Sequence, residues 1–147
     1  MKTPQKLKYL CFGVTALLLG ISTGVTTSAY ANSQLSIIEG YAKEAKQLEK
    51  GFKAFSIERG HQLFSTRHAL GKPETPSCTA CHTKSPLNVG STRAGKEIAP
   101  MAVSKTPDRY TDPKKVEKWF RRNCKSVLGR PCTPLEKGDF LTFMMSQ

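Results

Sequence analysis

The sequence predicts an all-α protein with long loops. Several stretches place apolar residues at spacings of three and four, the pattern of one helix face. Asp-Pro and Thr-Pro pairs stand where two of these helices would begin. No segment shows the strict alternation of a half-buried strand. The chain has no internal repeat, and its 147 residues suit a single domain.

Composition narrows the class of protein further. The chain carries 23 Lys and Arg residues against 11 Asp and Glu, a formal charge of +12. Its hydrophobic fraction of 38% is low for a globular chain but too high for a wholly disordered one. Because only one long apolar run exists, a polytopic membrane protein is excluded.

That apolar run, at residues 10–25, belongs to a predicted signal peptide at residues 1–31. Lys2, Lys6 and Lys8 precede it, and Ala29-Tyr30-Ala31 has the small-residue pattern of a cleavage site. An uncleaved N-terminal anchor is the alternative. Cleavage after Ala31 leaves a mature domain of residues 32–147 with a charge of +9. We therefore expect a periplasmic protein with no stable membrane anchor.

Two helices are expected in the first part of the mature chain. Asn32 and Ser33 are candidate N-caps for the first, which would end near Gly51. Its expected buried stripe consists of Leu35, Ile38, Tyr41, Ala42, Ala45 and Leu48. The second helix would cover residues 52–68, with Ile57, Gly60 and Phe64 on one face. A glycine on that face lets another helix approach closely.

Residues 71–107 are expected to be largely irregular, because they contain five prolines and many Ser and Thr residues. An irregular segment of this length is unusual in a compact domain, so we expect a bound group to order it. A third helix follows, with Asp112 as N-cap, Pro113 in the first turn and an end near Val127. Thr133 and Glu136 form a capping box for the last helix, which would bury Phe140, Leu141 and Met144.

Within the irregular region, Cys78-Thr79-Ala80-Cys81-His82 has the spacing C-x-x-C-H. In an exported protein this motif predicts one covalently attached haem c. Cys78 and Cys81 can form thioethers with the two vinyl groups of one porphyrin, and His82 then reaches the iron as an axial ligand. A bound haem would also order the long loop.

A redox-active motif and a zinc site are two alternatives to haem that would use the same cysteines. A redox-active C-x-x-C lacks the βαβ pattern that surrounds such motifs. A zinc site would need a second cysteine pair at matching spacing, whereas Cys124 and Cys132 are eight residues apart. The haem interpretation is therefore favoured.

The ligand opposite His82 decides between electron transfer and gas binding. Met101, in a loop 19 residues after His82, is the conventional candidate and would give a closed electron carrier. His61 and His68 are expected to be polar surface positions. Met144 and Met145 are expected to be core and tail residues. An open or weakly ligated iron would instead accept diatomic gases.

Asn123 is a less usual candidate for this position. It lies in a stripe of the third predicted helix at spacings of three and four, formed with Val116, Trp119, Phe120 and Val127. A buried amide without partners costs about 1–3 kcal/mol. Asn123 therefore either bonds the backbone or a haem propionate, or it directs its amide oxygen at the iron. Periodicity leaves both possibilities open.

Four segments of the C-terminal half resemble the sphaeroides haem protein family. They are RYTD at 109–112, KWFRRNC at 118–124, GRPCT at 129–133 and EKGD at 136–139. The resemblance covers roughly residues 52–147, and its Asn-Cys and Cys-Thr anchors are specific to the family. It implies a class I cytochrome c-like helical fold wrapped around one covalent haem, here with an extra N-terminal helix.

The family resemblance also implies a role for particular residues. Asn123 matches the family's asparagine ligand, which binds ferric iron and leaves on reduction, so that ferrous iron binds oxygen or nitric oxide. A neutral amide oxygen is a hard, weak donor that suits ferric iron better, which agrees with this behaviour. The resemblance further implies a Cys124–Cys132 disulfide and a dihaem cytochrome c as electron donor.

Other functional classes remain open or are disfavoured. The outer face of the third helix is basic and is either simply solvated or docks an acidic redox partner; its residues are Lys114, Lys115, Lys118, Arg121, Arg122 and Lys125. Nucleic acid is not an expected partner of an exported haem protein.

Two alternative functions remain. One is an ordinary electron carrier with Met101 on iron, and the other is a haem enzyme acting on a nitrogen or oxygen species. No acid–base pair for an enzyme is recognisable.

Overall fold

The computed structural model describes residues 25–147, so the predicted n-region and most of the apolar run lie outside the described residues. The all-α prediction is confirmed, since the strands of the described part form only one short antiparallel hairpin with Gly90 opposite Ile98. In chain order the elements are α1 (Val25–Leu48), α2 (Ile57–Ser65), α3 (Thr79–His82), β1 (Gly90–Ser91), β2 (Glu97–Ile98), α4 (Pro113–Leu128) and α5 (Pro134–Met145).

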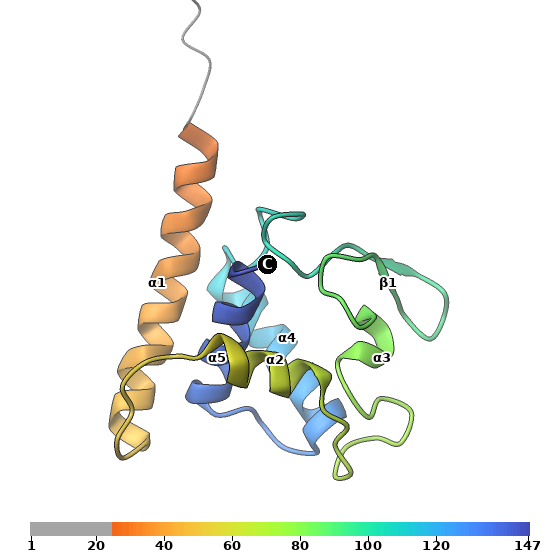
Figure 1. Cartoon of the computed structure of the whole chain (residues 1–147). Helices are drawn as coiled ribbons and strands as arrows, with labels where there is room; N and C mark the ends of the chain where they lie inside the picture. Colours follow the sequence, from red (N-terminus) through yellow and green to blue (C-terminus); the bar gives the residue numbers. More distant parts are fainter. Residues whose placement is uncertain (1–24) are drawn as a thin grey trace, which may run out of the picture.

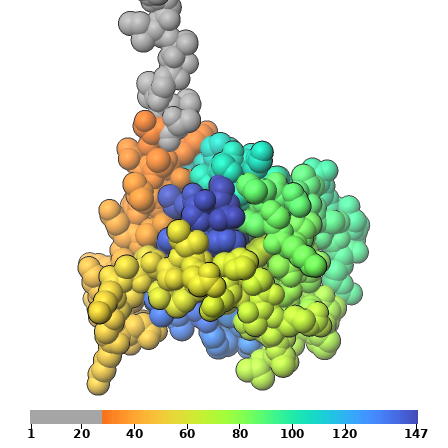
Figure 2. Space-filling model, viewed as in Figure 1, coloured from red at the N-terminus to blue at the C-terminus, as the bar shows by residue number. Residues whose placement is uncertain are grey.

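The elements divide the molecule into three parts. Figure 1 shows α1 along one flank, α3 with the hairpin along the other, and α2, α4 and α5 between them. The segment around α2 lies across α5 on the face shown in Figure 2. The region 71–107 is mostly irregular, as expected, but it also contains α3 and the hairpin. No helix of the described chain has both the length and the hydropathy needed to cross a membrane.

The prediction that Asn32 or Ser33 caps the first helix is wrong, because residues 25–31 are already helical and belong to α1. Residues 25–31 contain no glycine or proline that would interrupt it. Ser33 is an interior residue whose hydroxyl donates to the Ala29 carbonyl one turn earlier, at 3.1 Å. The predicted cleavage site at residues 29–31 therefore lies within α1, which continues through it.

The buried face of α1 differs from the predicted stripe. Tyr41 and Ala45 are buried as predicted, but Leu35 and Leu48 are exposed. Gln34 is buried instead, and its Nε2 donates to the carbonyls of Pro107 and Arg109 at 2.9 and 2.7 Å. The helix thus presents a polar anchor to the loop before α4 that apolar periodicity does not reveal.

Close packing of α2 on α5 is confirmed at Gly60. A β-carbon on Gly60 would stand 2.1 Å from the Asp139 carbonyl oxygen and 2.7 Å from Phe143 Cβ. The helix itself is shorter than predicted, because Ser56 caps its N-terminus by accepting from the Arg59 amide. Ile57 is exposed rather than buried.

The predicted start and end of α4 and the predicted start of α5 are confirmed. Asp112 accepts hydrogen bonds from the Lys114 and Lys115 amides, and Gly129 ends α4 in the left-handed conformation. Thr133 and Glu136 form the predicted capping box of α5. The predicted core residues of α5 are all buried, namely Phe140, Leu141 and Met144.

The core lies where α1, α2, α4 and α5 meet. Phe140 of α5 packs edge-to-face on Phe120 of α4, with ring centres 5.6 Å apart. Phe64 of α2 and Tyr41 of α1 complete the cluster from the other two helices. Edge-to-face aromatic pairs add about 0.5–1.5 kcal/mol to the burial of their rings. This cluster fixes α4 relative to the rest of the fold.

Candidate haem-binding site

The turn formed by α3 brings the haem-attachment motif together. Cys78 is the N-cap of this helix, and the His82 amide donates to the Cys78 carbonyl at 3.1 Å. Cys78 and Cys81 are three residues apart on one helical turn, so they share a face. Both thiols are free, as thioether formation requires.

Burial sets the protonation of these groups. Burial, with a smaller contribution from the charge of Arg109, lowers the pKa of His82 to about 4. His82 is therefore neutral at pH 7, the form in which an imidazole ligates a metal. Burial also raises the pKa of the Cys78 thiol to about 11, so this thiol stays protonated.

These residues fit a covalent haem. Two free thiols and a neutral imidazole lie on one short turn, and His82 Nδ1 is buried without a hydrogen-bond partner among the described residues. Close packing holds the turn in place, since a β-carbon on Gly90 would stand 2.3 Å from the Cys81 carbonyl oxygen. The zinc alternative loses its second pair of ligands, because Cys124 and Cys132 are bonded to each other.

Asn123 is not in the buried stripe that its spacing predicted. Val116, Phe120 and Val127 are buried, but Asn123 is exposed and Trp119 is 46% exposed. The buried sector of α4 is completed by Cys124 and Leu128, which shifts its centre away from Trp119 and Asn123. Asn123 therefore lies on the flank of α4 that other protein residues leave uncovered, and no hydrogen bond of the described residues joins it to His82.

Met101, the alternative ligand, is buried. Its amide and that of Ala102 both donate to the Pro86 carbonyl, at 2.8 and 2.9 Å. Pro86 follows His82 by four residues, so the Met101 loop is attached to the chain that leaves the haem motif. The Met101 sulfur is 3.9 Å from the Tyr110 hydroxyl.

The other candidate ligands behave largely as expected. His61 is exposed and Met144 is buried in the core, as predicted. His68 differs from its predicted surface position, because its Nε2 is buried and has no hydrogen-bond partner among the described residues. Met145 is partly buried at the end of α5.

Arg109 and Tyr110 are neighbours of the site that residue-type reasoning did not single out. The Arg109 guanidinium donates to the carbonyls of Pro100 and Ala99, both at 2.6 Å. Tyr110 is partly buried against the core, and loss of hydration around its hydroxyl raises its pKa far above the ordinary value. Its backbone is left-handed, with φ of 61°, which a bulky residue rarely adopts. The only sequence signal was their presence in the RYTD segment.

The disulfide stands at the end of the helix that carries Asn123. Cys124 and Cys132 form it across the α4–α5 connection, with α-carbons 5.6 Å apart. The chain that leads to Cys78 packs against the same helix end. The Lys72 amide and Thr75 hydroxyl both bond the Ser126 carbonyl, at 2.7 and 3.2 Å. The end of α4 is thus fixed from two sides.

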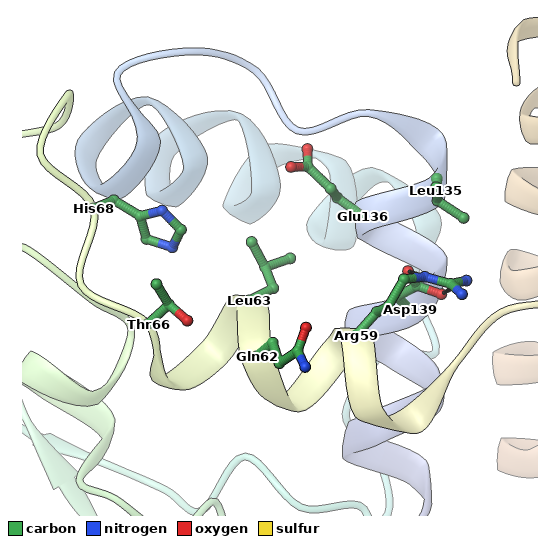
Figure 3. Close-up of a pocket in the computed structure, with 8 residues that line it drawn as sticks. All are labelled: Arg59, Gln62, Leu63, Thr66, His68, Leu135, Glu136 and Asp139. Carbon is green, nitrogen blue, oxygen red and sulfur yellow. Dashed lines mark hydrogen bonds and ion pairs between the residues drawn. The ribbon is translucent and has the colours of Figure 1, made fainter.

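A separate hollow of about 270 Å³ lies between α2 and α5. Figure 3 shows Arg59 from α2 beside Asp139 from α5 on one side of it, with His68 on the other. Arg59 and Asp139 form a bidentate ion pair at 2.7 and 2.8 Å. None of the predicted haem ligands lines this hollow.

Known proteins similar to this chain are c-type cytochromes. Residues 50–144 match a family described as a domain of unknown function, DUF1924. The cytochrome c-type protein SHP of Cereibacter sphaeroides is 52% identical over 69% of this chain and 82% of its own length. Cytochrome c'' of Methylophilus methylotrophus is 32% identical over 84% of this chain and 90% of its own length.

Solved structures agree with this assignment. Oxidised SHP, described as an oxygen-binding cytochrome c, superposes with a TM-score of 0.71 at 50% identity. That match covers 78% of this chain and 96% of SHP. Oxidised cytochrome c'' gives 0.70 at 31% identity, over 79% of this chain and 95% of the other. This chain therefore belongs to the SHP family, the sphaeroides haem proteins, and is a cytochrome that binds haem c covalently.

Proposed function

We propose that this protein works in the periplasm as a c-type cytochrome that binds oxygen or nitric oxide when reduced. The observation that carries the proposal is its 50% identity, over 96% of the relative's chain, to a cytochrome described as oxygen-binding. Haem c, when bound, would supply an iron that takes protein or gas ligands and exchanges one electron. The protein's own residues would decide whether a gas can reach that iron.

Each site residue has a distinct role in this proposal. Cys78 and Cys81 would hold haem c through thioether bonds, and the neutral His82 imidazole would bind its iron. The Asn123 amide oxygen would bind the ferric iron as a second ligand. An amide oxygen is a weak, hard donor, whereas ferrous iron favours softer ligands, so Asn123 would release the reduced iron and leave it open to a gas.

Two further parts of the proposal concern the protein's setting. The predicted signal peptide supports export, and an oxidising compartment would keep the Cys124–Cys132 disulfide intact. A dihaem cytochrome c is the proposed electron donor. The basic residues of α4 that were predicted to face outward are all exposed. They form an electropositive surface suited to an acidic redox partner.

One structural observation favours a second candidate function. The Met101 amide donates to the carbonyl of Pro86, which follows His82 by four residues, so Met101 lies on a loop attached to the haem-binding segment. With Met101 on iron the protein would be an ordinary His/Met electron carrier with a raised potential. The two functions differ in whether reduced protein accepts an external ligand.

Optical spectra of oxidised, reduced and carbon monoxide-treated protein test the proposal. We expect high-spin ferrous protein that shifts promptly with carbon monoxide. Asn123→Ala should keep the haem but lose the sixth ferric ligand, whereas Asn88→Ala, at an exposed loop asparagine, should leave the ferric spectrum unchanged. Low-spin ferrous protein indifferent to carbon monoxide would overturn gas binding and favour Met101. A ferric spectrum unchanged by Asn123→Ala would overturn the ligand assignment.

A further inference from the structure

The loop that carries Met101 comprises residues 99–112, between β2 and α4, and hydrogen bonds within this loop hold its backbone. Arg109 donates to the two carbonyls that precede Met101, those of Ala99 and Pro100. The Thr106 hydroxyl also donates to the Pro100 carbonyl, at 2.9 Å. The backbone just before the sulfur-bearing residue therefore has little freedom to move.

Met101 itself is fixed at both ends of its backbone. Its amide donates to the Pro86 carbonyl at 2.8 Å, and its carbonyl accepts from the Tyr110 hydroxyl at 3.0 Å. The same hydroxyl lies 3.9 Å from the sulfur. The side chain is part of the hydrophobic core rather than directed to solvent. To ligate the iron from another position, Met101 would have to break these contacts together.

The two clamping residues are themselves anchored. Gln34 of α1 donates to the carbonyls of Pro107 and Arg109, and its side chain is buried. Tyr110 is held in a left-handed backbone conformation that its surroundings must enforce. The clamp therefore connects α1 to the loop between β2 and α4 that carries Met101.

We propose that Arg109 and Tyr110 keep Met101 from taking the axial position opposite His82 when Asn123 leaves. They act as positioning residues that determine ligand specificity. The inference rests on the proposed function, because it explains how the reduced site stays open although the chain contains a soft sulfur ligand. Ferrous iron favours thioether sulfur over an amide oxygen, so an unrestrained Met101 would compete with an external gas.

Carbon monoxide titration of reduced holoprotein tests the clamp. Tyr110→Phe removes only the hydroxyl, and Arg109→Gln removes the guanidinium while leaving the backbone that Gln34 binds. Each should increase the low-spin ferrous fraction and weaken apparent carbon monoxide affinity by about tenfold, since only the open fraction binds. Arg130→Gln, at an arginine that contacts Glu136 and Pro131, should change neither readout.

Met101→Leu in each variant background provides the decisive control. If the clamp restrains Met101, this second substitution restores wild-type carbon monoxide affinity and spin state, which also shows that the variant is folded. Failure to restore them, or clamp variants that bind carbon monoxide as wild type does, would overturn the inference and leave gas binding intact. If reduced wild-type protein does not bind carbon monoxide, and Met101→Leu alone makes it bind, the proposed function and the clamp are both wrong.

Discussion

Gly60 allows α2 and α5 to cross at backbone contact. Gly60→Ala would place a methyl group 2.1 Å from a backbone carbonyl oxygen, which cannot move aside as a flexible side chain does. We expect a loss of about 1–3 kcal/mol in unfolding free energy, the usual cost of overpacking. Urea unfolding of both proteins measures it.

Gly40 provides the matched control on α1. A β-carbon there would meet nothing within 4 Å. Gly40→Ala should therefore stabilise the protein by about 0.5–1 kcal/mol, because alanine loses less conformational entropy in a helix. If Gly60→Ala and Gly40→Ala changed the unfolding free energy equally, helix propensity rather than the close helix crossing would explain the effect at Gly60.

Residue spacing predicted some positions well and others poorly. C-x-x-C-H specifies its own chemistry within five residues, and the exposed, polar character of His61 follows from local sequence. The exposure of Trp119 and Asn123 does not follow from local sequence. Residues spaced by three and four cover a wider sector of α4 than the neighbouring elements bury. Which edge of that sector is covered depends on tertiary packing. The contacts of Arg109 and Tyr110 with residues 99–101, nine or ten residues earlier in the same loop, likewise leave no periodic signal in the sequence.

At the scale of elements, a polar junction joins α1, α4 and α5. The Tyr41 hydroxyl donates to Glu117, and Lys137 Nζ donates to both Glu117 oxygens at 2.8 and 2.9 Å. Burial and the neighbouring Glu117 raise the pKa of Tyr41 far above its ordinary value, so it remains a donor. Burial of Glu117 acts in the opposite direction, yet hydrogen bonds from Lys137 and Tyr41 hold its pKa below the ordinary value.

The lowered pKa of Glu117 predicts that this junction weakens in acid. A carboxyl group with a lower pKa in the folded state contributes its full stability above the unfolded pKa and loses it as pH falls through the folded pKa. Glu117→Gln should cost about 0.5–1 kcal/mol near neutral pH, a modest value because the side chain is 51% exposed. The difference from wild type should vanish well below pH ~4. Chemical unfolding across this pH range measures it.

Glu39→Gln is the control for the junction. Glu39 is exposed on α1, and its carboxylate belongs to none of the ion pairs of the described chain. This substitution should change stability little at any pH. A Glu117→Gln effect that persists unchanged in acid would show that packing, and not the charge, matters at the junction.

Capping signals predicted the elements better than apolar periodicity did. Asp112-Pro113 and the Thr133–Glu136 box fix helix starts because each satisfies orphan amides locally. The buried face of α1 depended instead on two distant carbonyls that Gln34 reaches. The helical conformation of residues 25–31 was missed although nothing in these residues breaks a helix. The hairpin was missed because two-residue strands leave no periodic signal.

At the scale of the whole molecule, a net charge of +12 is concentrated in part on α4, beside the one tryptophan of the chain. Trp119 is 46% exposed, with the charged groups of Arg122 and Lys118 lying 5.2 and 5.8 Å from its ring centre. Asn123 follows one turn later. An acidic partner that docks on this surface would therefore stand next to the proposed axial ligand.

Charge reversal separates docking on α4 from the effect of overall charge. Ferricyanide is a small anionic oxidant whose rate constant with reduced protein reports the local potential where the electron leaves. Lys118→Glu with Arg122→Glu should lower that rate constant about tenfold at low ionic strength, because local fields steer encounter. Lys50→Glu with Lys53→Glu removes the same net charge from exposed positions outside α4 and should have a much smaller effect. Stopped-flow absorbance measures both.

Salt dependence and site integrity decide the interpretation. The difference between the two double variants should disappear at high ionic strength, since the Debye length shrinks to about 3 Å in 1 M salt. Arg122 adjoins Asn123, so the ferric spectrum and carbon monoxide binding of the α4 variant must match wild type before its rate is compared. Equal slowing by both variants would mean that net charge governs encounter and that electrons pass through another surface. Selective slowing would locate electron exchange beside Trp119, where docking and loss of the Asn123 ligand can be coupled.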